Sequence, residues 1–141
     1  MNNTDIEKLG KHPTPFYYYD TELLRNTLAA ILQETKQHDN YHVHYAVKAN
    51  ANPKILKVIK EAGLGIDCVS GGEIEAALNA GFPADQIVYA GVGKSDAEIL
   101  LGLKSGIFSF NVESIPELEI INELALQEGK IARVALRINP N

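Results

Sequence analysis

Short apolar stretches alternate along the chain with longer segments in which apolar residues recur every three or four positions. The short runs, rich in β-branched residues, predict buried strands, and the longer spacing predicts amphipathic helices. Successive strands are about 20 to 25 residues apart, which leaves room for one strand, one helix and two short loops. The pattern therefore predicts parallel βα units, with strands that begin near His42, Gly65, Ile87, Ile107 and Ala132.

Glycine and proline mark the limits of the predicted helices. Gly63, Gly81 and Gly129 each follow a helical apolar pattern, where a left-handed residue commonly closes the last turn. Pro53 and Pro116 precede such patterns, and proline in a first turn removes no helical hydrogen bond. These residues support the division into strand and helix.

A further helix is expected before the first strand. Asp20 is a suitable N-cap, and the pattern extends to about Gln37. Five apolar residues are expected to be buried on one side of this helix: Leu23, Leu24, Leu28, Ile31 and Leu32.

The regularity of the units decides between two α/β architectures. Without hairpin signals, the alternatives are an open doubly wound sheet and a (β/α)8 TIM barrel, and the even spacing favours the barrel. A complete barrel takes about 250 residues and eight strands. Because the chain has 141 residues, we expect a partial (β/α)8 TIM barrel with its first five strands and intervening helices.

Side chains alternate across a strand, so polar residues in these strands can be assigned to a face. From His42 to Lys48, the even-numbered residues share the inward face, and the apolar odd-numbered residues face the helices. Lys48 is thus expected at the carboxyl end of its strand, inside the barrel, where barrel enzymes assemble their active sites.

The same alternation directs charged residues of two other strands inward. Asp67 faces inward in the second strand, and Arg137 and Asn139 do so near the end of the fifth, while Val134, Leu136 and Ile138 face the helices. Charged groups inside a barrel are costly unless they are paired. Convergence of Lys48, Asp67 and Arg137 therefore indicates a site, although a structural ion pair between Lys48 and Asp67 explains the spacing equally well.

Three other patterns carry weaker signals. His42 and His44 share a face, but no third metal ligand is evident, so we predict no metal site. The amides of Ser70–Glu73 precede a helix and could attract an anion, although glycines there often only form a turn. Gly91–Ser95 lacks the spacing of a nucleotide-binding loop.

Composition excludes several classes of function. The chain carries 13 basic and 18 acidic residues, a net charge of -5 with no basic stripe, so nucleic acid is not an expected partner. Apolar runs are too short for a membrane span, and the polar start lacks a signal pattern, so the cytoplasm is expected. The single cysteine, Cys68, is expected in the core.

Six motifs occur in order along the chain: Thr14–Asp20, Tyr45–Asn50, Asp67–Glu73, Gly93–Asp96, Phe110–Ser114 and Leu136–Pro140. Together they resemble the alanine-racemase-like, fold-type III pyridoxal phosphate-dependent decarboxylases, and most closely the diaminopimelate decarboxylases. The resemblance implies an entry strand segment over residues 1–20, which packs with a β-domain in that family. Residues 21–141 then form the amino-terminal part of the cofactor-binding barrel.

The resemblance also implies a chemistry for four charged residues. Lys48 holds pyridoxal 5'-phosphate as an imine, and Asp67, Glu73 and Arg137 belong to the network of charges and hydrogen bonds around the cofactor. Lys48, Asp67 and Glu73 are the expected catalytic residues, and Lys48, Asp67 and Arg137 are expected to bind the cofactor. The expected reaction is decarboxylation of meso-2,6-diaminopimelate to lysine by a cytoplasmic homodimer.

Several alternatives remain open at this point. A related ornithine, arginine or carboxynorspermidine decarboxylase shares the lysine motif, whereas alanine racemase is disfavoured by Ala51-Asn52-Pro53 after the motif. The family's phosphate-binding glycine loop and partner-subunit cysteine have no counterpart here. We therefore expect this chain alone to have little or no activity, as part of a decarboxylase, as a non-catalytic cofactor-binding fragment, or as a regulatory partner of the full enzyme.

Overall fold

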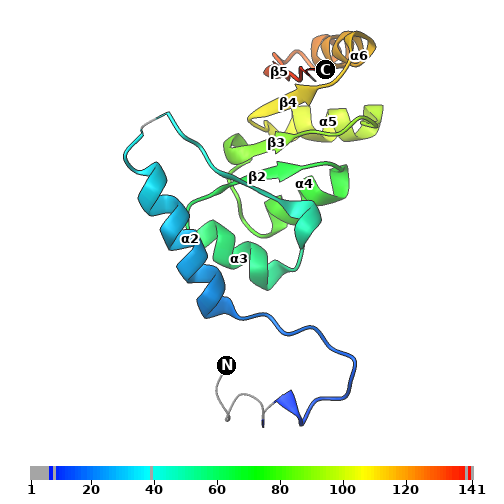
Figure 1. Ribbon diagram of the computed structural model, residues 1–141. Helices are drawn as coiled ribbons and strands as arrows, with labels where there is room; N and C mark the ends of the chain where they lie inside the picture. The colour runs from blue at the N-terminus through cyan, green and yellow to red at the C-terminus, as the bar shows by residue number, and fades with distance from the viewer. Residues whose placement is uncertain (1–6, 8, 39, 139, 141) are drawn as a thin grey trace.

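The computed structural model describes residues 7, 9–38, 40–138 and 140. Five parallel strands form one sheet in the order β1-β2-β3-β4-β5 (Figure 1). The strands are β1 (His44–Ala46), β2 (Gly65–Cys68), β3 (Ile87–Tyr89), β4 (Ser109–Val112) and β5 (Val134–Leu136). The helices are α2 (Thr21–Thr35), α3 (Pro53–Glu61), α4 (Gly71–Asn79), α5 (Asp96–Ser105) and α6 (Ile115–Gln127), with short 3₁₀ turns η1 (Val47–Ala49) and η2 (Ala84–Gln86).

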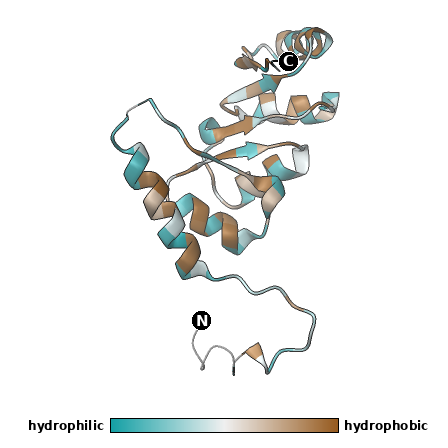
Figure 2. Ribbon diagram, in the orientation of Figure 1, coloured by the Kyte–Doolittle hydropathy of each residue, from teal (hydrophilic) through white to brown (hydrophobic). Residues whose placement is uncertain are grey.

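The sequential strand order places the helices on one face of the sheet. Connections between neighbouring parallel strands are right-handed, so each crossover helix returns over the same side. Apolar residues of the strands and helices meet there in one core, which runs along the sheet (Figure 2). The largest fully buried side chains in this core include Tyr89, Leu56, Ile59, Ile66, Ile74, Ile87, Ile99 and Ile121. The predicted fold class, a partial (β/α)8 barrel with five strands, is confirmed.

The strand positions agree closely with the sequence pattern. β2 and β3 begin at the predicted residues, whereas β1, β4 and β5 begin two residues later than predicted, at His44, Ser109 and Val134. The register pairs Ala46 with Asp67, Asp67 with Val88, and Val88 with Ser109. Asp67 therefore lies in a row across the sheet, on the face opposite to the helices.

Helix α2 confirms its predicted start but not its predicted burial. The Asp20 carboxylate accepts hydrogen bonds from the amides of Glu22 and Leu23 at 3.0 and 2.9 Å, as an N-cap does. The helix ends at Thr35, two residues before Gln37. Leu28 is buried, Leu24 and Leu32 pack against the core, and the predicted burial of Leu23 and Ile31 is wrong because α3 covers only a narrow stripe of α2.

Both predicted types of helix boundary are found. Gly63, Gly81 and Gly129 have φ angles of 83°, 84° and 63°, so each closes a helix in the left-handed conformation. Pro53 and Pro116 lie in the first turns of α3 and α6. These signals depend on local backbone sterics, which explains why they could be recognised without tertiary information.

The apolar residues of β5, at one edge of the sheet, are more exposed than predicted. Val134 and Leu136 pair in register with the buried Phe110 and Val112, which confirms their face, yet they are 40% and 64% exposed. Ile138 is also exposed, and no helix follows β5 within the described residues.

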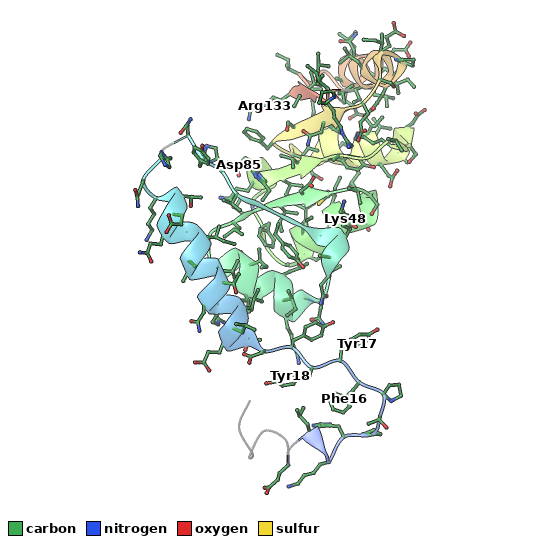
Figure 3. The ribbon with its side chains drawn as sticks, viewed as in Figure 1. Phe16, Tyr17, Tyr18, Lys48, Asp85 and Arg133 are labelled. Carbon is green, nitrogen blue, oxygen red and sulfur yellow. The ribbon has the colours of Figure 1, made fainter. Side chains whose placement is uncertain are left out.

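The segment before α2 forms no strand among the described residues. Residues 16–19 lie outside helices and strands, and Phe16, Tyr17 and Tyr18 lie on an extended segment away from the sheet (Figure 3). Most of residues 1–8 and Asn139 lie outside the described residues. The assignment of residues 1–20 to an entry strand stays a prediction.

Candidate active site at the carboxyl ends of the strands

Lys48 lies in a tight turn just after β1, and not within the strand (Figure 3). The strand ends at Ala46, so the predicted position of Lys48 as a strand residue is wrong. Val47 is 1% exposed and anchors the turn in the core, while Lys48 beside it is exposed. The Asn50 amide donates to the Val47 carbonyl at 2.9 Å, and the Tyr45 hydroxyl donates to the Asn50 carbonyl at 3.1 Å.

The Lys48 amine forms no hydrogen bond or ion pair with any described residue. A structural ion pair with Asp67, one of the two explanations of the spacing, is therefore not formed. The turn holds the lysine by its backbone and by Val47 and leaves the amine accessible. This arrangement suits a lysine whose amine reacts with a ligand.

Asp67 lies one strand away from Lys48 and combines burial with an unpaired oxygen. Its Oδ1 atom is buried and has no hydrogen-bond partner among the described residues. Burial raises the pKa of Asp67, and the positive charge of Lys48, followed by the charge of His44, opposes this rise. Ala46, two residues before Lys48, pairs in register with Asp67, so Lys48 and Asp67 lie at the same end of two neighbouring strands. A buried polar atom without a partner indicates a site for a donor that the protein does not supply.

Glu73 supports the turn that follows β2. Its Oε2 accepts a hydrogen bond from the Val69 amide at 2.8 Å, and its own amide donates to the Ser70 hydroxyl at 3.3 Å. Ser70 is thereby the N-cap of α4. Glu73 thus fixes the backbone next to Asp67, and its assignment as a catalytic residue stays a prediction.

Arg137 is not brought next to Lys48. It follows β5, whereas Lys48 follows β1, and these strands are the two opposite edges of the sheet. The Arg137 Nη1 atom instead donates to both carboxylate oxygens of Glu113, at 3.0 and 2.9 Å. Within the described residues, Lys48 and Asp67 thus lie at the ends of neighbouring strands, whereas Arg137 lies at the opposite edge of the sheet. The assignment of these three residues to one site stays a prediction.

The carboxyl ends of β3 and β4 are joined by a buried lysine. The Lys94 side chain is 1% exposed, and its amine lies 2.6 Å from Glu117 Oε1. It also donates to the carbonyls of Gly91 and Asn111 at 2.6 and 2.9 Å. All three protons of the ammonium therefore have acceptors. Gly91–Ser95 is thus a structural loop, in agreement with its poor match to a nucleotide-binding loop.

The amides at the start of α4 hold an anion from within the chain. Glu98 Oε1 accepts from the Gly71 amide at 2.7 Å, while Oε2 accepts from the amide and hydroxyl of Ser95 at 3.0 and 2.8 Å. These three donors, the Gly71 amide first, lower the pKa of Glu98 to about 2. Gly71 makes the contact possible, since a Cβ atom there would lie 2.8 Å from Glu98 Cγ.

Glu98 and Glu117 were missed by the sequence analysis, although a signal was present. Ser-x-x-Glu occurs at residues 70–73, 95–98 and 114–117, between each of the strands β2, β3 and β4 and the first turn of the helix that follows it. This spacing is the capping box, in which serine and glutamate satisfy the free amides of a helix start. The sequence could therefore have shown that three helices begin alike. It could not show that Glu98 reaches across to the preceding unit.

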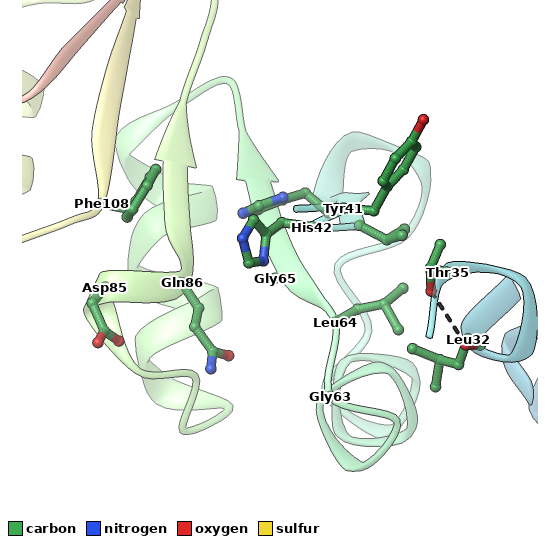
Figure 4. A pocket seen from close by; sticks show the side chains of 12 residues that line it. Leu32, Thr35, Tyr41, His42, Gly63, Leu64, Gly65, Asp85, Gln86 and Phe108 are labelled. Atoms are coloured by element: carbon green, nitrogen blue, oxygen red, sulfur yellow. Dashed lines mark hydrogen bonds between the residues drawn. The ribbon is translucent and has the colours of Figure 1, made fainter. Parts of the chain in front are cut away.

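The histidines lie at the other end of the strands. A hollow of about 350 Å³ there is lined by residues that include His42, His44, Gln86 and Phe108 (Figure 4). No group of three or more potential metal ligands occurs in the described part of the chain. Because barrel enzymes assemble their chemistry at the carboxyl ends of the strands, we assign the hollow no role.

A further prediction concerns the burial of Cys68. Cys68 is fully buried, and burial raises the pKa of its thiol to about 12, so it is a core residue. Among the described residues, the helices are too short or too polar to cross a membrane.

The fold and the accessible lysine define a class of protein: an α/β barrel segment that presents an accessible amine and a partly buried acid at the carboxyl ends of its first two strands. A family model described as the pyridoxal binding domain of pyridoxal-dependent decarboxylases matches residues 24–141. The chain belongs to this family.

Individual members of the family show which decarboxylases this chain is similar to. Diaminopimelate decarboxylase of Bacteroides thetaiotaomicron is 67% identical over 136 residues, which are 96% of this chain and 35% of that protein. L-glutamyl-[BtrI acyl-carrier protein] decarboxylase of Niallia circulans is 37% identical over 100% of this chain and 33% of its own length. The crystal structure of Helicobacter pylori diaminopimelate decarboxylase complexed with L-lysine has a TM-score of 0.89 and 42% identity, covering 97% of this chain and 34% of that one. The chain spans about a third of the length of the curated relatives it matches.

Proposed function

We propose that this chain contributes the lysine and the first half of the cofactor site to a pyridoxal phosphate-dependent decarboxylase that converts meso-2,6-diaminopimelate to L-lysine. The 67% identity with the Bacteroides thetaiotaomicron diaminopimelate decarboxylase carries this proposal. The crystal structure of the Helicobacter pylori enzyme with L-lysine supports the assigned product. Within this proposal, the protein acts in the cytoplasm as a homodimer.

The residues of this chain fit the cofactor. Lys48 offers an accessible amine without a partner among the described residues, and Asp67 offers a buried oxygen that lacks a donor. Lys48 would hold the cofactor covalently, with Asp67 and Arg137 in the charge network around it. Bound pyridoxal phosphate supplies an electron sink for the pair of electrons that remains when carbon dioxide leaves.

The protein groups provide orientation and charge. Val47 and the Asn50–Val47 hydrogen bond fix the turn that carries Lys48, just after the carboxyl end of β1. Burial raises the pKa of Asp67 and so favours its neutral acid, while the positive charge of Lys48 favours the Asp67 carboxylate. Glu73 holds the Val69 amide and so maintains the backbone after Asp67.

Cofactor capture is tested on the purified chain. Pyridoxal phosphate is added, the product is reduced with borohydride, and peptides are examined by mass spectrometry. Attachment at Lys48 in the native chain, and its loss in Lys48→Ala, is the expected result. Lys54→Ala is the matched control, since Lys54 is another exposed lysine six positions along the chain. Equal labelling of many lysines would refute a specific site.

The reaction is tested by release of carbon dioxide from meso-2,6-diaminopimelate. The complete product of the gene that encodes this chain should release it, with L-lysine as product. The chain on its own should release little, because it spans about a third of its relatives. Preference for ornithine, arginine or an acyl-carrier-protein-bound glutamyl group over diaminopimelate would reject the substrate while retaining the class of reaction.

A further inference from the structure

A closed ring of hydrogen bonds surrounds Glu113 at the carboxyl ends of β3 and β4. The Glu113 amide donates to Glu117 Oε2 at 2.9 Å, and Lys94 donates to Glu117 Oε1 at 2.6 Å. Lys94 also donates to the Gly91 carbonyl at 2.6 Å, and the Gly91 amide returns to Glu113 Oε1 at 3.1 Å. The ring therefore holds Glu113 by both its backbone and its carboxylate.

The ring is joined to an exposed side chain through the ion pair between Glu113 and Arg137. Arg137 donates from Nη1 to both oxygens of Glu113, and the Arg137 side chain is 59% exposed whereas that of Glu113 is 12% exposed. One end of the ion pair is thus held rigidly and the other reaches outward. The recorded contacts use only Nη1 of the guanidinium, so its remaining donors are available to another anion.

We propose that Glu113 is the positioning residue for Arg137: it fixes the guanidinium in the orientation in which its remaining donors meet the bound cofactor. This inference rests on the proposed function, because the cofactor role of Arg137 belongs to that proposal. Glu113 itself does not touch the cofactor. Its carboxylate is suited to the task because the Gly91 amide and the ring around it oppose its rotation, and charge-assisted hydrogen bonds are stronger than neutral ones.

Neighbouring charges support the assignment. Lys94 and Glu117 neutralise each other within the ring. The negative charge of Glu113 is matched by Arg137 alone among the recorded ion pairs of the described residues. A change of Glu113→Gln therefore removes the charge that attracts Arg137 while leaving an amide oxygen that can still accept the Gly91 hydrogen bond.

The first test measures the order of the Arg137 side chain by nuclear magnetic resonance, without cofactor. Restricted rotation of the guanidinium is expected in the native chain and fast rotation in Glu113→Gln. Glu119→Gln is the control, since Glu119 is exposed on the same helix region and the change removes the same charge. Retained restriction in Glu113→Gln would overturn the proposal, provided that its far-ultraviolet circular dichroism matches that of the native chain.

The second test measures the dissociation constant of pyridoxal phosphate. Glu113→Gln should raise it by about tenfold, the effect of one weakened charge-assisted hydrogen bond. In an Arg137→Gln background the same change should have no further effect, because positioning acts only through the arginine. Independent, additive effects would reject positioning. If the native chain and Arg137→Gln bind equally, the cofactor role of Arg137 fails, while the resonance experiment still decides whether Glu113 orders the side chain.

Discussion

Two lysines lie near the carboxyl ends of the strands, and their surroundings are opposite. Lys94, between β3 and α5, is 1% exposed and donates to three oxygens. Lys48, in the turn after β1, is exposed and has no recorded partner among the described residues. The Lys94 side chain holds its own loop by hydrogen bonds. The turn that carries Lys48 is held by Val47 and by the Asn50–Val47 hydrogen bond, without the lysine side chain. The comparison shows that Lys94 is structural because its set of acceptors is complete, whereas the Lys48 amine is left accessible.

The largest expected effect on stability comes from replacing Lys94, the lysine whose hydrogen-bond partners are complete. Lys94→Met should destabilise the chain by about 3 to 5 kcal/mol, because it leaves the Glu117 carboxylate and two carbonyls without their donor. Lys104→Met removes a lysine whose side chain is 59% exposed and pairs with Glu128 at 3.3 Å. This control should cost about 1 kcal/mol or less. Urea unfolding measures both, and equal losses would show that burial of the Lys94 pair has no special importance.

A pair of glycine substitutions tests the contact between neighbouring units. Gly71→Ala should destabilise the chain by about 1 to 3 kcal/mol, because its Cβ atom would lie 2.8 Å from Glu98 Cγ and disturb a charged hydrogen bond. At Gly72, the nearest atom to an added Cβ is Ser70 Oγ at 4.0 Å. Gly72→Ala should therefore be neutral or slightly stabilising. Equal thermal midpoints for the two variants would contradict the steric argument.

The pH dependence of stability tests the same carboxylate. The folded pKa of Glu98 is about 2, below its ordinary value of 4.5. The contribution of Glu98 is thus fully present above about pH 4.5 and lost as the pH falls towards about pH 2. Glu98→Gln should reduce the free energy of unfolding at pH 7 by about 1 to 2 kcal/mol and make the acid slope between these pH values shallower. An unchanged slope would show that another group controls the acid transition.

The smallest expected effect on stability comes from replacing Lys48, the lysine without a partner among the described residues. Lys48→Ala should change the free energy of unfolding by no more than about 0.5 kcal/mol, because no recorded contact of the amine is lost. Chemical denaturation provides this measurement, alongside the loss of covalent cofactor capture described above. Lys48→Met is a useful companion, since it keeps much of the apolar stem. A large loss of stability in both variants would mean that Lys48 is a structural lysine like Lys94.

Much of the fold could be predicted because its signals are local. The left-handed glycines at Gly63, Gly81 and Gly129 and the Asp20 cap depend on a few neighbouring residues. The alternation of strand faces depends only on backbone geometry, and it correctly placed Cys68 in the core. The candidate site was less predictable. The alternation assumed that β1 continues to Lys48, but the backbone turns after Ala46, so the lysine leaves the strand.

The sequence by itself determined the repeated strand-helix units, the faces of the strands and the presence of Lys48, Asp67, Glu73 and Arg137 near strand ends. Those features arise from periodicity and from motifs whose members are close along the chain. Only the tertiary structure decided which charges are paired. Glu98 reaches Gly71 and Glu113 reaches Arg137 across 27 and 24 positions of the chain, and such contacts depend on sheet register and loop geometry. Lys48 is left accessible for the same reason: the fold provides partners for Lys94 and none among the described residues for the amine after β1.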